Sequence, residues 1–133
     1  MIERGWGRIV NISSTASVVA IPQLAHYCTS KAGLAMLTKG LAVELGPHGI
    51  TVNGVGPSTV KTRLNEEVLA RGDMELREAE LNPTRRLGTP PISPRPWPSW
   101  RGTRPSWING QNIVVDGGLT ALSPQPAYEM GSR

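Results

Sequence analysis

Residues 25–57 read AHYCTSKAGLAMLTKGLAVELGPHGITVNGVGP and carry the clearest structural signal in this 133-residue chain. Within them the leucines recur at three- and four-residue spacing, at Leu34, Leu37, Leu41 and Leu45. This period predicts a helix over residues 25–45, which the Gly46-Pro47 pair ends. The β-branched residues that follow predict a strand over residues 50–55.

A further strand is predicted on each side of this stretch. Residues 8–12, RIVNI, form a short β-rich run that predicts a buried parallel strand, and residues 13–22 then form a loop. Residues 112–115, NIVV, predict another strand, which the sequence Asp-Gly-Gly closes. A strand, a helix and a strand in one sheet imply a right-handed crossover and therefore an α/β fold with a parallel sheet.

The remaining segments are less regular. Residues 66–81 are charged and helix-prone apart from Gly72-Asp73 in the middle, so we expect a mobile amphipathic helical segment, with a solvated surface helix as the alternative. After Leu122, two prolines indicate a disordered tail over residues 123–133. We therefore expect one domain over residues 1–122.

Composition limits the kinds of protein this chain can be. A hydrophobic content of 38% suits a globular domain with a core. No apolar run approaches the roughly 20 residues that cross a bilayer, and the first residues do not begin a signal peptide. The net charge of +4 includes Arg95, Arg101 and Arg104 from one proline-rich stretch, so neither a nucleic-acid nor a membrane partner is expected. A single cysteine, Cys28, cannot form an internal disulfide, which fits a reducing cytoplasm.

Tyr27, Lys31 and Ser14 form the candidate catalytic group. Tyr27 and Lys31 lie four positions apart in the predicted helix, and Ser14 ends a Ser-Ser pair thirteen positions before Tyr27. Residues at i and i+4 share a helix face, so the Lys31 ammonium can lie beside the phenol and favour its ionised form. The Ser14 hydroxyl, placed by the preceding strand, can bond both the phenol and a substrate carbonyl oxygen, which suits proton relay coupled to hydride transfer. Taken alone, the Tyr/Lys spacing also fits an exposed surface pair.

No metal site is predicted. Neither His26 nor His48 has a partner at ligand spacing, and His48 falls in a predicted turn. Cys28 is expected to be a small, half-buried side chain beside Tyr27.

Four blocks in this order resemble a known family. They are RIVNISS at residues 8–14, the helix with Tyr27 and Lys31, ITVNGVGP at residues 50–57 and NGQNIVVDGG at residues 109–118. Together they resemble the C-terminal half of a short-chain dehydrogenase/reductase. The resemblance implies a doubly wound, Rossmann-like parallel sheet, NAD or NADP as cofactor, and a small-molecule substrate interconverted between carbonyl and alcohol. It also implies that the full-length form is a homo-oligomer.

The resemblance assigns roles to individual residues. Tyr27 would be the general acid in reduction and the general base in oxidation. Lys31 would favour the ionised phenol and bind the nicotinamide ribose. Ser14, rather than its neighbour Ser13, would orient the substrate carbonyl or hydroxyl.

The same resemblance points to a cofactor-binding loop after the strand at residues 50–55. Pro57, Val60 and Thr62 would hold the nicotinamide carboxamide or a phosphate, and Tyr27 and Lys31 would contribute from the helix. Two positions depart from the family pattern, because Ser58 and Ser17 stand where a glycine is usual or common. The Ser58 change puts any left-handed backbone angle there in doubt.

The family binds its dinucleotide with an N-terminal strand-turn-helix unit that carries a glycine-rich turn, and this sequence contains no such motif. We therefore expect a fold truncated at the N-terminus that is inactive on its own. The alternative is a non-catalytic fragment or interaction module. The choice between NAD and NADP depends on a residue of that other unit.

Residues 91–105 read PISPRPWPSWRGTRP where the family has a helix. Each proline inside a helix costs about 3 kcal/mol, so the segment is expected to be irregular. The family pattern resumes in register at Ser106, so the segment has the length that the family uses but not the family's sequence. Two compensating frameshifts explain this combination, and a true proline-rich insert is the alternative.

Overall fold

A computed structural model describes residues 1–90 and 107–122. Its strands are β1 (Gly7–Ile12), β2 (Ile50–Pro57) and β3 (Asn112–Val115), and its α-helices are α1 (Ala25–Leu45), α2 (Glu66–Leu69) and α3 (Met74–Glu80). Short 3-10 helices join them: η1 (Ile2–Arg4), η2 (Thr15–Ser17), η3 (Gly46–His48) and η4 (Leu119–Ala121).

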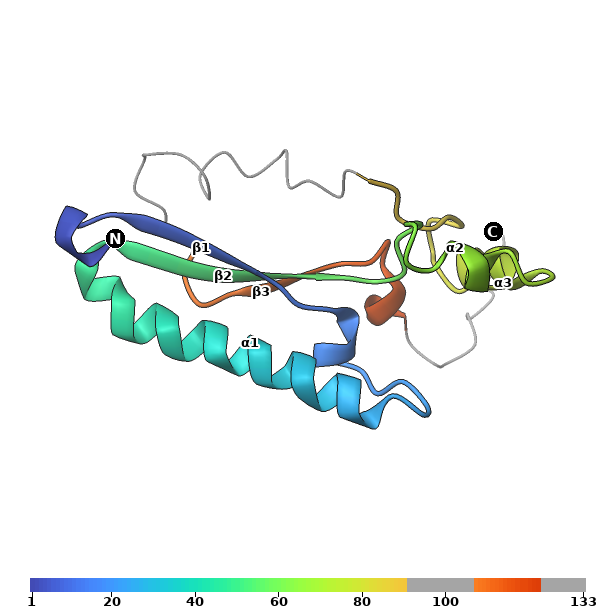
Figure 1. Ribbon diagram of the computed structural model, residues 1–133, viewed down its shortest axis with the longest axis horizontal. Helices are drawn as coiled ribbons and strands as arrows, with labels where there is room; N and C mark the ends of the chain where they lie inside the picture. The colour runs from blue at the N-terminus through green and yellow to red at the C-terminus, as the bar shows by residue number, and fades with distance from the viewer. Residues whose placement is uncertain (91–106, 123–133) are drawn as a thin grey trace, which may run out of the picture.

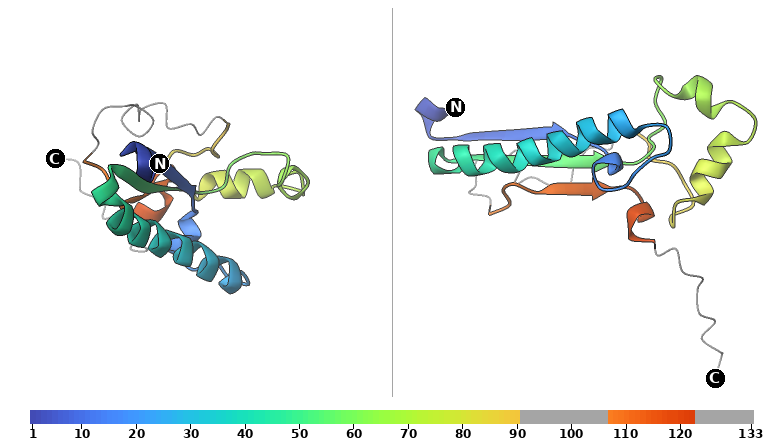
Figure 2. Two further views of the ribbon diagram at one scale, coloured as in Figure 1. Left: turned by 60° about the vertical axis from the view of Figure 1, so that its left-hand side comes forward. Right: turned by 90° about the horizontal axis from the view of Figure 1, so that it is seen from below.

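The strands form one parallel sheet, as predicted, and the structure gives their order as β1-β2-β3. Gly7 of β1 lies opposite Ile50 of β2, and Gly54 of β2 lies opposite Asn112 of β3. β2 runs two residues beyond its predicted end because Pro57 and the residue before it still pair with β3. Figure 1 shows α1 running along the sheet from the carboxyl end of β1 back to the start of β2, and Figure 2 shows α1 on one face of the sheet.

The core lies between α1 and β2. Ala42, Ile50 and Val52 are buried there, and partly buried side chains of β1 and α1 pack against them: Ile9, Leu41 and Leu45. Burying a large aliphatic side chain stabilises a fold by roughly 1.5–3 kcal/mol, so these contacts hold the helix to the sheet. The predicted bounds of the helix at residues 25–45 are confirmed.

Two predictions about burial are wrong. β1 is not a buried strand, because it lies at the edge of the described sheet with β2 as its neighbour, and Ile12 is 62% exposed. Leu37 is 52% exposed although it belongs to the predicted apolar stripe. It lies at the margin of that stripe, and Thr38 is buried in its place. Met36 and Val43 are also exposed, so α1 carries apolar side chains away from the sheet as well as toward it.

Two asparagines hold the start of β3 in place. Asn53, which is 2% exposed, donates from Nδ2 to the Ile108 carbonyl at 2.9 Å and accepts at Oδ1 from the Gln111 N–H at 3.0 Å. Asn109 accepts at Oδ1 from the Val52 N–H at 2.8 Å and donates from Nδ2 to a carbonyl of α1 at 3.0 Å. The approach to β3 is therefore bonded to both β2 and α1.

Residues 66–81 form two short helices rather than one. Gly72 has a φ of 58°, in the left-handed region that glycine adopts readily, and it separates α2 from α3. An ion pair between Arg77 Nε and Asp73 Oδ2, at 2.9 Å, links the start of α3 to its next turn. Figure 1 shows both helices beyond the carboxyl ends of the strands.

The predicted irregular segment at residues 91–105 and the predicted tail at residues 123–133 lie outside the described residues. Among the helices that are described, none combines the length and the apolar character needed to cross a membrane.

Candidate active site

The carboxyl end of β1 leads directly into the Ser-Ser pair. The Ser13 N–H donates to the Val55 carbonyl at 2.7 Å and so extends the strand pairing by one residue. Ser14 is 8% exposed, and its Oγ accepts a hydrogen bond from the Ala16 N–H at 3.1 Å at the start of η2. Because the oxygen acts as the acceptor in that bond, the hydroxyl hydrogen of Ser14 remains available to a carbonyl oxygen.

Tyr27 and Lys31 lie on successive turns of α1. The Lys31 Nζ is 5.7 Å from the centroid of the Tyr27 ring, within the range of a cation–π contact. Tyr27 is 37% exposed, and its hydroxyl has no hydrogen-bond partner among the described residues. The phenol is therefore open to a ligand.

Lys31 also joins α1 to the end of β1. Its Nζ donates to the Ile12 carbonyl at 3.0 Å, and the Ser13 hydroxyl donates to the Lys31 carbonyl at 3.5 Å. An ammonium has three donor hydrogens, so one bond to Ile12 leaves two for other acceptors. The structure thus places Lys31 at the carboxyl end of β1, where Ser14 follows. The carboxyl ends of parallel strands are where such sheets bind ligands.

The three residues assigned to cofactor binding lie at the end of β2 and in the loop that follows it. Pro57 ends β2 and pairs with Val115 of β3. Val60 forms an isolated parallel bridge with Gly88. Thr62 follows two residues later. Because β1 and β2 are parallel, this loop leaves β2 at the same end of the sheet at which Ser14 follows β1.

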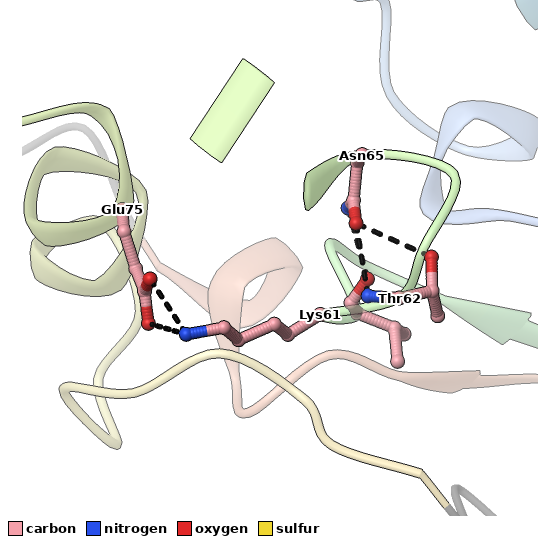
Figure 3. Close-up of polar contacts among 5 residues, drawn as sticks. Lys61, Thr62, Asn65 and Glu75 are labelled. Atoms are coloured by element: carbon pink, nitrogen blue, oxygen red, sulfur yellow. Dashed lines mark hydrogen bonds and ion pairs between the residues drawn. The ribbon is translucent and has the colours of Figure 1, made fainter. Parts of the chain in front are cut away.

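Asn65, which the sequence analysis did not single out, organises this loop. Its Oδ1 accepts from the Thr62 N–H at 2.9 Å and from the Thr62 hydroxyl at 3.2 Å (Figure 3), and its Nδ2 donates to the Val60 carbonyl at 2.9 Å. Lys61 extends toward α3 and forms an ion pair with Glu75 at 2.8 Å. The Thr62 N–H and hydroxyl hydrogen are therefore used within the loop, and the hydroxyl oxygen remains able to accept a hydrogen bond. A local signal for Asn65 exists, because asparagine side chains commonly bond nearby backbone at turns and helix starts.

A cleft of about 340 Å³ opens at the carboxyl ends of β2 and β3, between the cofactor loop and the Asp-Gly-Gly segment. Asp116 lines it. Partial burial works to raise the pKa of Asp116, but hydrogen bonds from the Thr120 hydroxyl, the Thr120 N–H and the Gly118 N–H outweigh burial and lower that pKa. The carboxylate thereby closes the turn into η4.

Cys28 follows Tyr27 in α1, and a second possibility at this site would be a metal. Cys28 is half-buried, and its sulfur accepts a hydrogen bond from the Ile21 N–H at 3.4 Å. Across residues 1–90 and 107–122, no three His, Cys, Asp or Glu side chains gather as metal ligands would.

Known proteins resemble this chain over most of its length. The family model described as enoyl-(acyl carrier protein) reductase matches residues 1–120. An NAD-dependent glycerol dehydrogenase of Listeria innocua is 36% identical over 120 residues, covering 90% of this chain and 47% of the relative. Carbonyl reductase (NADPH) 2 of Sus scrofa is 38% identical over 122 residues, covering 91% of this chain and 50% of the relative.

A solved structure also resembles this chain in its fold. The gluconate 5-dehydrogenase of Burkholderia cenocepacia, in complex with NADP and tartrate, superposes with a TM-score of 0.79 at 31% identity, covering 92% of this chain and 48% of that chain. The chain spans about half the length of the curated relatives it matches. A family match over residues 1–120, with relatives that are dehydrogenases and reductases sharing this parallel sheet, shows that the chain belongs to the short-chain dehydrogenase/reductase family of NAD(P)-dependent oxidoreductases.

Proposed function

We propose that this chain carries the catalytic group of an oxidoreductase that interconverts a small-molecule carbonyl and alcohol, with Tyr27 as the proton donor in reduction and the acceptor in oxidation. The observation that carries the proposal is the position of the Lys31 ammonium. It lies 3.0 Å from the Ile12 carbonyl and 5.7 Å from the centroid of the Tyr27 ring, at the strand end that continues into Ser14.

In this proposal each side chain has one task. The Ser14 hydroxyl donates to the substrate carbonyl oxygen and orients it, while the backbone bond from Ala16 holds the Ser14 oxygen. Tyr27 delivers its phenolic proton to the same substrate oxygen as negative charge develops there. The Lys31 cation stabilises the phenolate that remains. In oxidation the proton moves in the opposite direction.

The residues present fit the nicotinamide end of NAD or NADP. Lys31 has donor hydrogens beyond the one that Ile12 accepts, and the Tyr27 hydroxyl is open among the described residues. Tyr27 and Lys31 from α1 and Pro57, Val60 and Thr62 from the loop would hold the cofactor. When bound, the nicotinamide supplies or accepts the hydride. The relatives differ in cofactor, since the glycerol dehydrogenase is NAD-dependent and the Sus scrofa reductase is named for NADPH.

The proposal extends to the place of this chain in the family. We propose that residues 1–122 correspond to the C-terminal, catalytic half of the family domain, that the full-length form is a cytoplasmic homo-oligomer, and that this half alone lacks activity. Coverage of 47% and 50% of the two relatives supports the chain being about half of the family domain. The exposed apolar side chains of α1, including Leu37 and Val43, support association with further protein surface.

Those exposed side chains also favour a second candidate, a non-catalytic interaction module. One experiment separates the two. The N-terminal half of the Sus scrofa carbonyl reductase is joined to this chain, and reduction of a small carbonyl substrate is followed by consumption of NADPH or NADH. The joined protein should turn over, Tyr27→Phe should abolish turnover while cofactor affinity stays largely intact, and the matched neighbour His26→Gln should change neither. A folded joined protein that keeps most of its kcat after Tyr27→Phe would refute the catalytic role.

A further inference from the structure

A chain of hydrogen bonds connects the first residue of β3 to Ser14. The Asn112 Nδ2 donates to the Ser17 Oγ at 3.0 Å, and the Ser17 hydroxyl donates to the Ser14 carbonyl at 2.7 Å. The Ser17 N–H donates to the same carbonyl at 3.0 Å. We propose that Asn112 and Ser17 are positioning residues that fix the orientation of the Ser14 side chain. The inference rests on the proposed function of Ser14.

The Ser14 carbonyl, at one end of this series of hydrogen bonds, determines the direction of the other bonds. The Ser14 carbonyl can only accept, so the single hydroxyl hydrogen of Ser17 is used there. The Ser17 oxygen must then accept from Asn112, which requires the NH₂ side of the amide, as observed. Aligned donors and acceptors of this kind polarise and strengthen one another.

The sequence of β2 provides the space for this contact. Asn112 pairs with Gly54 across the sheet, and a Cβ on Gly54 would collide with the Asn112 Oδ1. A Cβ on Gly56 would lie 3.1 Å from the Ser14 carbonyl oxygen. The two glycines of β2 therefore let an amide from β3 and the backbone of Ser14 approach the same strand.

Asn112 has an unfavourable feature that a purely structural role does not explain. Its Oδ1 is buried with no hydrogen-bond partner among the described residues. An apolar side chain of similar size would avoid this loss, because a buried acceptor without a partner destabilises a fold. What only the amide provides at this position is the donor to Ser17.

The contacts act on both sides of Ser14. Its carbonyl is held by the Ser17 hydroxyl and N–H, and its Oγ is held by the Ala16 N–H at 3.1 Å. With the peptide plane and the side-chain oxygen both fixed, the Ser14 hydroxyl hydrogen has a restricted set of directions. Loss of the Asn112 or Ser17 contact should therefore release the Ser14 side chain without unfolding the sheet.

The test uses the 133-residue chain without cofactor, so it does not depend on turnover. NMR couplings that report the χ1 angle of Ser14, and the hydrogen exchange of the Ala16 amide, are measured in the native chain, Ser17→Ala, Asn112→Leu and the double variant. Thr29→Val is the matched control, because it also removes a hydroxyl that donates to a backbone carbonyl, at 2.9 Å on α1. The Val52 amide, bonded to Asn109, reports global stability.

Each single variant should average the Ser14 χ1 couplings and speed Ala16 exchange by roughly five- to tenfold, the effect of losing one hydrogen bond. The double variant should add little to either single change, and Thr29→Val should leave Ser14 unchanged. Unchanged χ1 couplings in Ser17→Ala, additive effects in the double variant, or Val52 exchange that accelerates as much as Ala16 exchange would overturn the proposal. Failure of the Tyr27 turnover test would leave these NMR results unaffected, so the two ideas fail separately.

Discussion

Replacing Lys31 with methionine should reduce catalysis far more than stability. The substitution keeps a long unbranched side chain and removes the ammonium that bonds the Ile12 carbonyl at 3.0 Å and faces the Tyr27 ring at 5.7 Å. A hydrogen bond to a charged group contributes about 1.5–3 kcal/mol, which partial exposure to solvent reduces to about 1 kcal/mol here. The cation–π contact adds roughly 0.5–1 kcal/mol at an exposed site. The free energy of unfolding should therefore fall by about 1–2 kcal/mol.

The expected effect on turnover is larger, because in the proposed mechanism Lys31 assists Tyr27 as the general acid and base, and general acid–base catalysis contributes about 10²- to 10⁴-fold. Urea unfolding of the 133-residue chain gives the first quantity, and kcat of the protein joined to the N-terminal half of a relative gives the second. Lys39→Met is the control, since Lys39 is an exposed lysine on the same helix. If Lys31→Met and Lys39→Met lower kcat equally, or if the whole loss of rate is matched by loss of folded protein, the role of Lys31 is refuted.

Three further outcomes are expected. Asn53→Ala should lower the free energy of unfolding by about 1–3 kcal/mol in urea titrations, because it removes both hydrogen bonds of a buried side chain. A loss no larger than that of Asn11→Ala would contradict this. Because folding lowers the pKa of Asp116, its carboxylate stabilises the fold above the ordinary carboxyl pKa, and this stabilisation is lost as pH falls through the lower folded pKa. The native protein and Asp116→Asn should therefore converge in free energy of unfolding below about pH 4. A constant difference down to about pH 2 would exclude that linkage. The 133-residue chain alone should show no measurable NAD or NADP binding by isothermal titration, and micromolar affinity would show that this half suffices.

Local sequence signals were enough for the elements that depend on local structure. The leucine period and the Gly46-Pro47 pair located α1, and the β-branched run at residues 112–115 located β3. The burial of β1 was not predictable in this way, because it depends on how many neighbours a strand has. The burial of Leu37 was predicted wrongly for a related reason. The leucine period identifies the apolar face of the helix, but it does not say which residues at the margin of that face are covered.

In the candidate site, too, contacts between residues close in sequence were predictable and contacts between distant residues were not. The spacing of Ser14, Tyr27 and Lys31 made all three candidates from sequence, and Lys31 lies beside the Tyr27 ring. The expected hydrogen bond between the Ser14 hydroxyl and the Tyr27 phenol is not found among the described residues. The contact between Ser17 and Asn112 spans 95 positions and has no sequence period. Such contacts depend on the register between β2 and β3, which no local sequence pattern determines.

The bonds from Asn53 and Asn109 determine which residues keep β3 attached to the rest of the fold. The information that docks β3 resides in side chains of β2 and in residues from Ile108 onward. These four bonds join Ala42, Val52 and Asn53 to residues 108, 109 and 111, so each of them is made by residues outside the stretch 91–106. A substitution at Asn53 or Asn109 should therefore loosen β3 even though both residues lie outside that strand.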